Sequence, residues 1–186
     1  FEYSSATSII LSDIITRTLT ESTDPLVRRD VTLRFIRGRL LEPLGMDGTY
    51  PEFDQNGTFL GGSFLHATAR DYATFGEFLR HNGAKKGAQH LPVSWVRFMK
   101  KSSPNDPAYG GHIWLNKQRP EGRNTVLFPD NGPDTIFAAL GHLGQQIVVS
   151  PEQQLTVVRL GKTQDDVLAP MRAQIGKIMA LFPIRG

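Results

Sequence analysis

Cysteine is absent from the 186 residues, which excludes disulfides, thiolate catalysis and cysteine-ligated metals. Long hydrophobic runs are also lacking, and no stretch approaches the roughly 20 apolar residues of a membrane-spanning helix. None of the five histidines lies at the His-x-x-x-His spacing of a helical zinc site. No glycine-rich phosphate loop leads from a predicted strand into a helix. The sequence therefore predicts no metal, no cofactor and no membrane span.

Charge of one sign is not in large excess either. The chain has 21 Lys and Arg residues and 18 Asp and Glu residues, which gives a net charge of +3. So small an excess does not by itself indicate a nucleic-acid partner. Hydrophobic residues make up 39% of the chain and charged residues 21%, a balance typical of globular proteins. We therefore expect a folded chain that does not bind nucleic acid.

The motifs that usually carry a serine nucleophile are missing. In Ser-x-x-Lys, three helical steps bring the lysine beneath the serine hydroxyl, but the nearest match, Ser94 to Arg97, ends in arginine. The nucleophile elbow Gly-x-Ser-x-Gly is incomplete at Gly61 to Leu65, where the final glycine is absent. The chain opens with Phe1 inside a candidate motif. We expect a nucleophile to lie upstream of Phe1.

Apolar spacing and turn residues predict an α+β fold, with helices first, then an antiparallel sheet, then a helix. We assign 1–108 to a helical lobe and 109–186 to the sheet and its closing helix. Side chains expected to face inward on the second helix are Val31, Phe35, Ile36 and Leu40. The expected helices are 6–20, 26–41, one beginning after the capping box Thr68 to Asp71, one beginning at Pro92, and 165–181.

Four short apolar runs separated by tight turns predict an antiparallel meander. The closing helix would cover one face of this sheet, and the other face would need cover from residues 1–108. Four strands are few for so much flanking helix, so strands from an upstream segment would complete the sheet. The expected strands are 111–116, 135–140, 145–150 and 155–160.

The first candidate site is the run from Phe1 to Ala6, just before the first predicted helix. Tyr3 and Ser5 can aim a phenol and a hydroxyl at one point. A phenol acts as a base near neutral pH only if neighbouring cations stabilise its anion. On these residues alone, a helix cap at Ser5 and a packing role for Tyr3 explain the pattern better.

The second candidate site is the run from Ala139 to Gln146, where His142 interrupts the sheet between two glycines. Glycine lets a substrate approach the backbone closely, which makes Gly144 a candidate for substrate contact. The backbone N–H of Gln145, at the start of the next strand, could stabilise an oxyanion. A hairpin turn with an exposed histidine is the simpler interpretation of this run alone.

Two further residues are candidates for substrate contact. Ser63 follows two glycines in a predicted loop, where binding residues are frequent. Trp114 lies on a predicted strand, although a packing role explains a tryptophan there more simply.

Taken in order, these runs resemble the C-terminal two-thirds of a class C β-lactamase-like or penicillin-binding-protein-like serine hydrolase. The same superfamily contains esterases and 6-aminohexanoate-dimer hydrolases. The order and spacing of the matching runs agree over nearly the whole chain. The runs are Phe1 to Ala6 with the helix after it, Leu41 to Met46 (LEPLGM), Gly61 to Gly76 (GGSFLHATARDYATFG), and Gly141 to Gln145 with the strands that follow.

The resemblance implies a β-lactamase/transpeptidase-like fold whose N-terminal portion, with the nucleophilic Ser and Lys, precedes Phe1. The active site of that fold lies between its two lobes. Tyr3 would be the general acid or base, and Ser5 would assist it. His142 would occupy the place of the lysine in Lys-Thr-Gly. The N–H of Gln145 would form half of the oxyanion hole, in an acyl-enzyme mechanism.

Two departures from the β-lactamase pattern favour an esterase or amide hydrolase. Ser5 occupies the place of an asparagine that holds the acyl amide. His142 replaces a lysine, and a histidine is only partly charged at neutral pH. Recognition of the carboxylate of a β-lactam would therefore be weaker. The substrate class expected from the resemblance is a small-molecule ester, amide or lactam.

The alternative is a non-catalytic binding protein that keeps the fold but has no nucleophile. In either case we expect the 186 residues to be inactive on their own, because the nucleophile is missing. An incomplete sheet exposes unpaired backbone, so we expect stability only with the N-terminal half or in an oligomer. The compartment stays open between a bacterial cytoplasm and periplasm.

Overall fold

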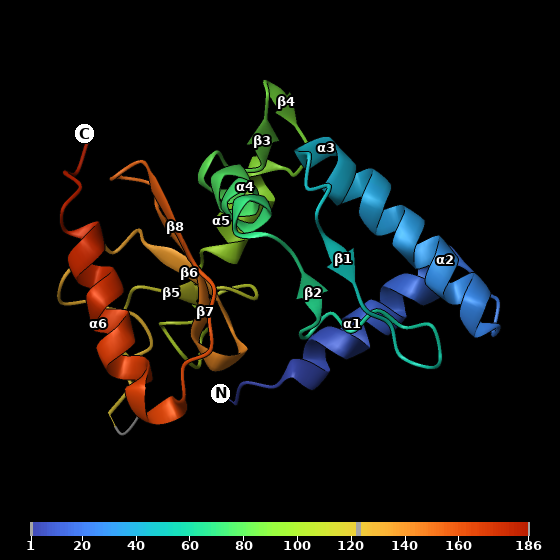
Figure 1. Ribbon diagram of the computed structural model, residues 1–186, viewed down its shortest axis with the longest axis horizontal. Coiled ribbons are helices and arrows are strands. Elements are labelled where there is room, and N and C mark those ends of the chain that lie inside the picture. Colours follow the sequence, from blue (N-terminus) through green and yellow to red (C-terminus); the bar gives the residue numbers. More distant parts are fainter. Residues whose placement is uncertain (1, 122–123, 186) are drawn as a thin grey trace. The chain divides into compact units, whose positions relative to one another are not determined.

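The computed structural model describes residues 2–121 and 124–185 (Figure 1). The chain forms two compact units, Phe1–Thr74 and Phe75–Gly186. Helices and antiparallel strands occur together, which confirms the α+β class. The predicted lobes, 1–108 and 109–186, concern the complete fold and stay a prediction.

The first unit begins with two helices, α1 (Ser5–Leu19) and α2 (Pro25–Ile36). The carboxylate of Asp24 caps α2 and accepts a hydrogen bond of 2.8 Å from the backbone N–H of Leu26. Proline at the first position of α2 costs no hydrogen bond, because that N–H has no partner within a helix. The helix continues through a π-helical turn, η1 (Arg37–Leu41), and α3 (Glu42–Leu44). Both predicted helices are confirmed.

Polar side chains, not apolar ones, occupy the buried positions of α1 and α2, which are Ser12, Thr16, Arg28 and Thr32. The Oγ1 atoms of Thr16 and Thr32 lie 3.0 Å apart, and both residues are buried. Ile10 and Ile14 of α1 are 61% and 51% exposed, and Phe35 of α2 is also exposed. The prediction that Phe35 faces inward is therefore wrong. The buried side of α2 is formed by two polar residues one turn apart, Arg28 and Thr32.

The rest of the first unit is a long loop with a small two-stranded sheet. Strand β1 (Tyr50–Pro51) pairs with β2 (Leu65–His66) in antiparallel register. The loop leads to α4 (Ala69–Arg80), whose start has the predicted capping box. The backbone N–H of Asp71 donates to Thr68 Oγ1 at 3.1 Å, and the hydroxyl of Thr68 donates to Asp71 Oδ2 at 2.9 Å.

The second unit is built on a four-stranded antiparallel sheet with the order β5-β6-β7-β8. Each strand is hydrogen-bonded to the next strand in the sequence, so the predicted meander is confirmed. The strands are β5 (Trp114–Leu115), β6 (Phe137–Gly141), β7 (Gln145–Ser150) and β8 (Leu155–Arg159).

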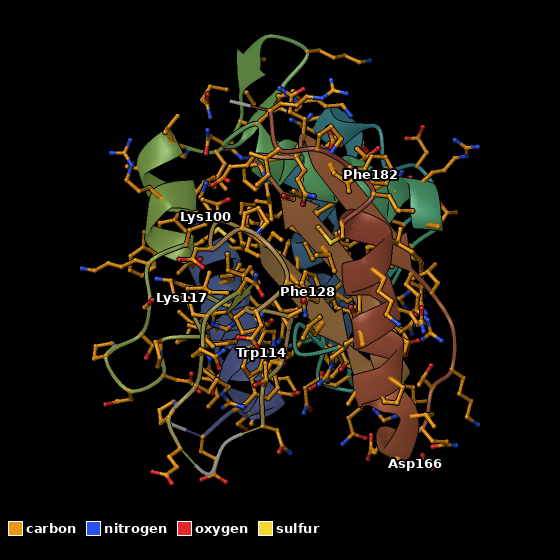
Figure 2. All side chains as sticks on the ribbon, turned by 90° about the vertical axis from the view of Figure 1, so that its left-hand side faces the viewer. Lys100, Trp114, Lys117, Phe128, Asp166 and Phe182 are labelled. Atoms are coloured by element: carbon orange, nitrogen blue, oxygen red, sulfur yellow. The ribbon has the colours of Figure 1, made fainter. Side chains whose placement is uncertain are left out.

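Helices lie on both faces of this sheet, as Figure 1 shows for α6 and α4. On one face, Val148 packs into a core with Ile175 of α6 (Leu168–Met179), which follows a short 3-10 turn, η3 (Asp165–Val167). Phe128, labelled in Figure 2, belongs to the same core. On the other face, Gly76 of α4 lies so close to Thr156 of β8 that an added Cβ would be 2.6 Å from its Cγ2 atom. The expected cover of both faces is confirmed.

A hairpin and a short helix connect α4 to the sheet. The hairpin pairs β3 (Ala84–Lys85) with β4 (Ala88–Gln89), and α5 (Val93–Met99) follows it. Within α5, only Val96 is buried. In the part of the chain that the structure describes, no helix combines the length and apolar character needed to cross a bilayer.

Candidate functional site

The start of α1 carries the first candidate site. The hydroxyl of Ser4 caps the helix and accepts a hydrogen bond of 3.3 Å from the backbone N–H of Ala6. Ser5 is the first residue of α1 and is exposed, so the interpretation that Ser5 itself is the cap is wrong. Tyr3 immediately precedes the cap and is half-exposed. The capping role of Ser4 leaves the hydroxyl of Ser5 available for other contacts.

A glycine loop packs directly on this end of α1. An added Cβ at Gly62 would lie 2.6 Å from the carbonyl oxygen of Ser5 and 2.9 Å from its Cβ. Only glycine allows the two backbones to approach so closely. Ser63 follows Gly62 and is exposed, and its backbone N–H donates to Leu60 O at 3.0 Å. Within the first unit, the fold therefore places Ser63 next to a loop residue that contacts Ser5.

A pocket of about 710 Å³ opens along α1 on the first unit. Its lining combines isoleucines of α1 with a polar wall centred on Arg28. The guanidinium of Arg28 is nearly buried and donates to Asp13 Oδ1 at 2.6 Å and to Asn56 O at 2.8 Å. Hydrogen bonds from Arg17 and then Arg28 hold the pKa of the Asp13 carboxyl below its usual value. The described lining does not include Tyr3, Ser5 or Ser63, so this pocket is separate from the first candidate site.

The second candidate site is the connection between β6 and β7 in the second unit. Strand β6 ends at Gly141, a 3-10 turn η2 (His142–Gly144) reverses the chain, and Gln145 begins β7 opposite Gly141. Two successive residues adopt left-handed conformations, with φ of 57° at Leu143 and 79° at Gly144. His142 and Gln145 are exposed at the two ends of this turn.

An arginine of β8 holds this turn in place. Nη1 of Arg159 donates to the carbonyl oxygens of Gly144 at 3.0 Å and Gly161 at 2.9 Å. The backbone N–H of Thr163 donates to Leu143 O at 2.9 Å. Sequence reasoning missed the role of Arg159 and Thr163. The available signal was a charged residue ending an otherwise apolar strand, which calls for a polar partner nearby.

Packing against α6 accounts for the glycine at position 144. An added Cβ there would lie 2.9 Å from Leu168 Cδ2 and 2.9 Å from Met171 Cε. The residue is also buried. The contact that we predicted between a substrate and the backbone of Gly144 stays a prediction.

Trp114, labelled in Figure 2, lies on strand β5 and contacts one aromatic and one cationic side chain. The ring of Tyr109 meets its indole edge to face, with centroids 4.8 Å apart. The guanidinium of Arg119 lies 5.4 Å from the indole centroid and is bound to Asp106 Oδ2 at 2.6 Å. Asp106 is fully buried. These contacts fix the orientation of Trp114, and its contact with a substrate stays a prediction.

Two other kinds of site would be a metal site and one with a different tyrosine as general base. Within residues 2–121 and 124–185, no group of three or more His, Asp or Glu side chains could hold a metal ion. Tyr72 is half-buried and its hydroxyl donates to the carbonyl oxygen of Leu65. Burial raises the pKa of the Tyr72 phenol. This tyrosine therefore stays neutral and is not a candidate for a general base.

The chain matches no protein-family model and no curated protein. Solved structures do match it. A protein from Bacillus anthracis assigned as a 6-aminohexanoate-dimer hydrolase aligns with 98% of this chain at 23% identity and a TM-score of 0.69. A β-lactamase from Mycobacterium bovis aligns with 96% at 17% identity and a TM-score of 0.68. The chain has a β-lactamase-like fold.

This shared fold covers only part of the matching proteins. The chain spans 45% of the Bacillus anthracis protein and 63% of the Mycobacterium bovis protein. A protein from Bacteroides dorei assigned as a β-lactamase aligns with 80% of this chain, at 16% identity and a TM-score of 0.51, and 54% of its own length is covered. The chain thus spans about half the length of the solved structures that it matches. At these identities the likeness establishes the fold.

Proposed function

We propose that the chain is part of a serine hydrolase that cleaves ester or amide bonds through an acyl-enzyme. The observation that carries this proposal is the arginine-held turn His142 to Gln145, exposed at its two end residues, on a β-lactamase-like fold. The structures that share the fold include proteins assigned as a β-lactamase and as a 6-aminohexanoate-dimer hydrolase. The exposed Tyr3 and Ser5 at the start of α1 add hydroxyl groups suited to proton transfer.

In the proposed reaction, the nucleophilic serine belongs to a segment of the protein outside these 186 residues. Its Oγ attacks the carbonyl carbon while Tyr3, acting as the general base, takes up its proton. The phenol then gives this proton to the leaving alcohol or amine as the scissile bond breaks. A water molecule hydrolyses the acyl-enzyme, and its proton returns through Tyr3 to the serine. The N–H of Gln145 stabilises the oxyanion in both steps.

The remaining candidates would position the substrate. Ser5 supports the proton transfer at Tyr3, and His142 contacts the substrate near the carbonyl group. Ser63, Gly144 and Trp114 would contact other parts of the substrate. Because no permanently charged lysine stands at His142, a substrate with a carboxylate beside the reacting bond gains less binding there. This supports a neutral ester or amide over a β-lactam.

Replacement of the proposed general base tests this mechanism. In the full-length gene product, Tyr3→Phe should lower kcat/KM for an activated aryl ester about 100-fold or more, because proton transfer by a positioned side chain contributes at least that factor. The matched control is Tyr50→Phe, another exposed tyrosine of the first unit, which should keep its activity. Activity that survives Tyr3→Phe would show that Tyr3 has no such role.

A non-catalytic binding protein that keeps the β-lactamase-like fold is the second candidate. It predicts that the full gene product lacks the Ser-x-x-Lys motif. It further predicts that the wild-type protein binds an ester without turning it over. Steady turnover by the wild-type protein would exclude this candidate.

A further inference from the structure

Residues 81–105 of the second unit carry positive charge and no negative charge. The segment has five Lys or Arg residues and two His residues, and no Asp or Glu. Its five cations exceed the net charge of the whole chain, which is +3. Charge is therefore concentrated on this segment and not spread evenly. The cations are Lys85, Lys86, Arg97, Lys100 and Lys101.

Hydrogen bonds join the β3–β4 hairpin and α5 into one surface. The carbonyl oxygen of Gly83 accepts from the backbone N–H of Leu91 at 3.1 Å, and Gln89 Nε2 donates to Asn82 O at 2.8 Å. Nζ of Lys100 donates to Asn82 Oδ1 at 3.2 Å, which ties the end of α5 to the base of the hairpin. Figure 2 shows the hairpin above α5, with Lys100 labelled beside the helix. We call the hairpin, α5 and the two lysines that follow it, Lys100 and Lys101, the basic aromatic surface.

Two large aromatic side chains lie exposed on this surface. Trp95 and Phe98 of α5 are 52% and 56% exposed, and their ring centroids are 5.3 Å apart. Val96 is buried and anchors the helix to the unit. Exposed Arg97 lies between the two aromatic residues in the sequence. The outer side of α5 thus combines apolar rings with positive charge.

The hairpin places a further cation at its tip. Lys86 and Gly87 form the two-residue turn, with φ of 49° and 82°. These left-handed conformations define a type I′ turn, which favours Asn followed by Gly. A lysine occupies the first position instead and is exposed. At the other end of the surface, Lys100 is partly buried, so the exposed cations are Lys86, Arg97 and Lys101.

We propose that the basic aromatic surface docks on the anionic headgroups of a phospholipid bilayer. Tryptophan and phenylalanine partition into the boundary between headgroups and acyl chains, and lysine and arginine attract anionic lipids. A second copy of this chain would bring the same positive charges to the contact and would be repelled. The docking would be peripheral, with α5 lying along the surface, and it is independent of the proposed hydrolase activity.

Flotation of the full-length gene product with lipid vesicles tests the docking. We expect binding to vesicles that mix phosphatidylcholine and phosphatidylserine at low salt, and little binding to pure phosphatidylcholine. The variant Lys86→Asn/Lys101→Gln should lower the partition coefficient about tenfold or more, since each cation near an anionic surface contributes about fivefold. Asn also suits the turn at position 86, so the hairpin should stay folded. Trp95→Ala/Phe98→Ala should weaken binding to a similar degree.

Matched controls distinguish the effect of this surface from the effects of net charge and of exposed apolar side chains in general. Lys162→Gln/Lys177→Gln removes the same charge at two exposed lysines elsewhere and should bind almost as the wild type does. Leu181→Ala removes an apolar side chain that is highly exposed and should leave binding unchanged. Absent binding to the anionic vesicles, or equal losses in test and control variants, would overturn the proposal. Binding to immobilised polyglutamate without binding to vesicles would show an acidic-protein site in place of the lipid.

Discussion

At the scale of single residues, a glycine can be required by a left-handed backbone conformation, by close packing, or by both. Gly144 adopts a left-handed conformation and also lies against α6, where an added Cβ would meet Leu168 and Met171 at 2.9 Å. Gly87, in the β3–β4 hairpin, has nearly the same conformation, with φ of 82°, but no atom within 4 Å of an added Cβ. A side chain at Gly87 would therefore meet backbone strain alone, whereas one at Gly144 would meet both backbone strain and close packing.

Alanine at each of these glycines should reveal the two costs. Gly87→Ala should lower the free energy of unfolding by about 1 kcal/mol, the cost of a left-handed alanine. Gly144→Ala should lower it by about 2 kcal/mol, because the ends of the Leu168 and Met171 side chains must also shift to make room for the methyl group. Urea unfolding of both variants of the full-length protein measures the difference. Equal losses would mean that the contact with α6 adjusts without cost.

The roles of single residues were harder to predict from the sequence than the positions of helices and strands. The Tyr3 to Ala6 run and the His142 turn stand out by composition, so both could be found from the sequence. Arg159 stood out only as a charge at the end of a strand, and its role could not be assigned, because the fold brings its three carbonyl partners around it. The cap at the start of α1 was placed one residue too late, because Ser4 and Ser5 are equally good capping residues.

At the scale of elements, an ion-pair group ties α4 to the edge strand β8. Glu77 accepts hydrogen bonds from Arg80 Nη2 at 2.6 Å and from Thr156 Oγ1 at 2.6 Å. The Arg80 hydrogen bond first, and that of Thr156 after it, hold the pKa of the Glu77 carboxyl below its usual 4.5, against the opposing effect of burial. A lowered pKa in the folded state stabilises the fold above pH 4.5 and is lost as the pH falls through the lowered value.

Replacing this carboxylate should therefore lower the free energy of unfolding at neutral pH and make it depend less on pH in the acidic range. Glu77→Gln should lower the free energy of unfolding at pH 7 by about 1 kcal/mol, a modest value because the group is partly exposed. Below pH 4.5 the variant should lose less stability than the wild type as the pH falls. The control is Glu21→Gln, an exposed glutamate. Urea unfolding between pH 3 and pH 7 measures both, and identical pH slopes in all three proteins would contradict this account.

Local spacing predicted the elements better than it predicted their faces. The strands of the meander and the closing helix follow from short apolar runs and tight turns, so their positions could be read from the sequence. The buried faces of α1 and α2 could not. Thr16 and Thr32 form the contact because their small hydroxyl groups pair with each other, while the larger Ile10, Ile14 and Phe35 stay exposed.

At the scale of the whole molecule, the chain contains a four-stranded sheet and aligns with only part of each related structure. Strands β5 and β8 are the outer strands of the sheet in the described part of the chain. The matching structures are roughly twice as long as the aligned region in two of the three cases. The order of elements could be predicted from the sequence, but the residues that complete the active site could not, because the proposal assigns them to a different segment.

The central claim is a serine hydrolase whose nucleophile lies outside these 186 residues. The most direct measurement is labelling of the full-length gene product with a fluorophosphonate probe, followed by identification of the labelled peptide. We predict a labelled serine in a Ser-x-x-Lys sequence, with labelling slowed by Tyr3→Phe. A label on Ser5 or Ser63, or no label on any serine, would contradict the claim.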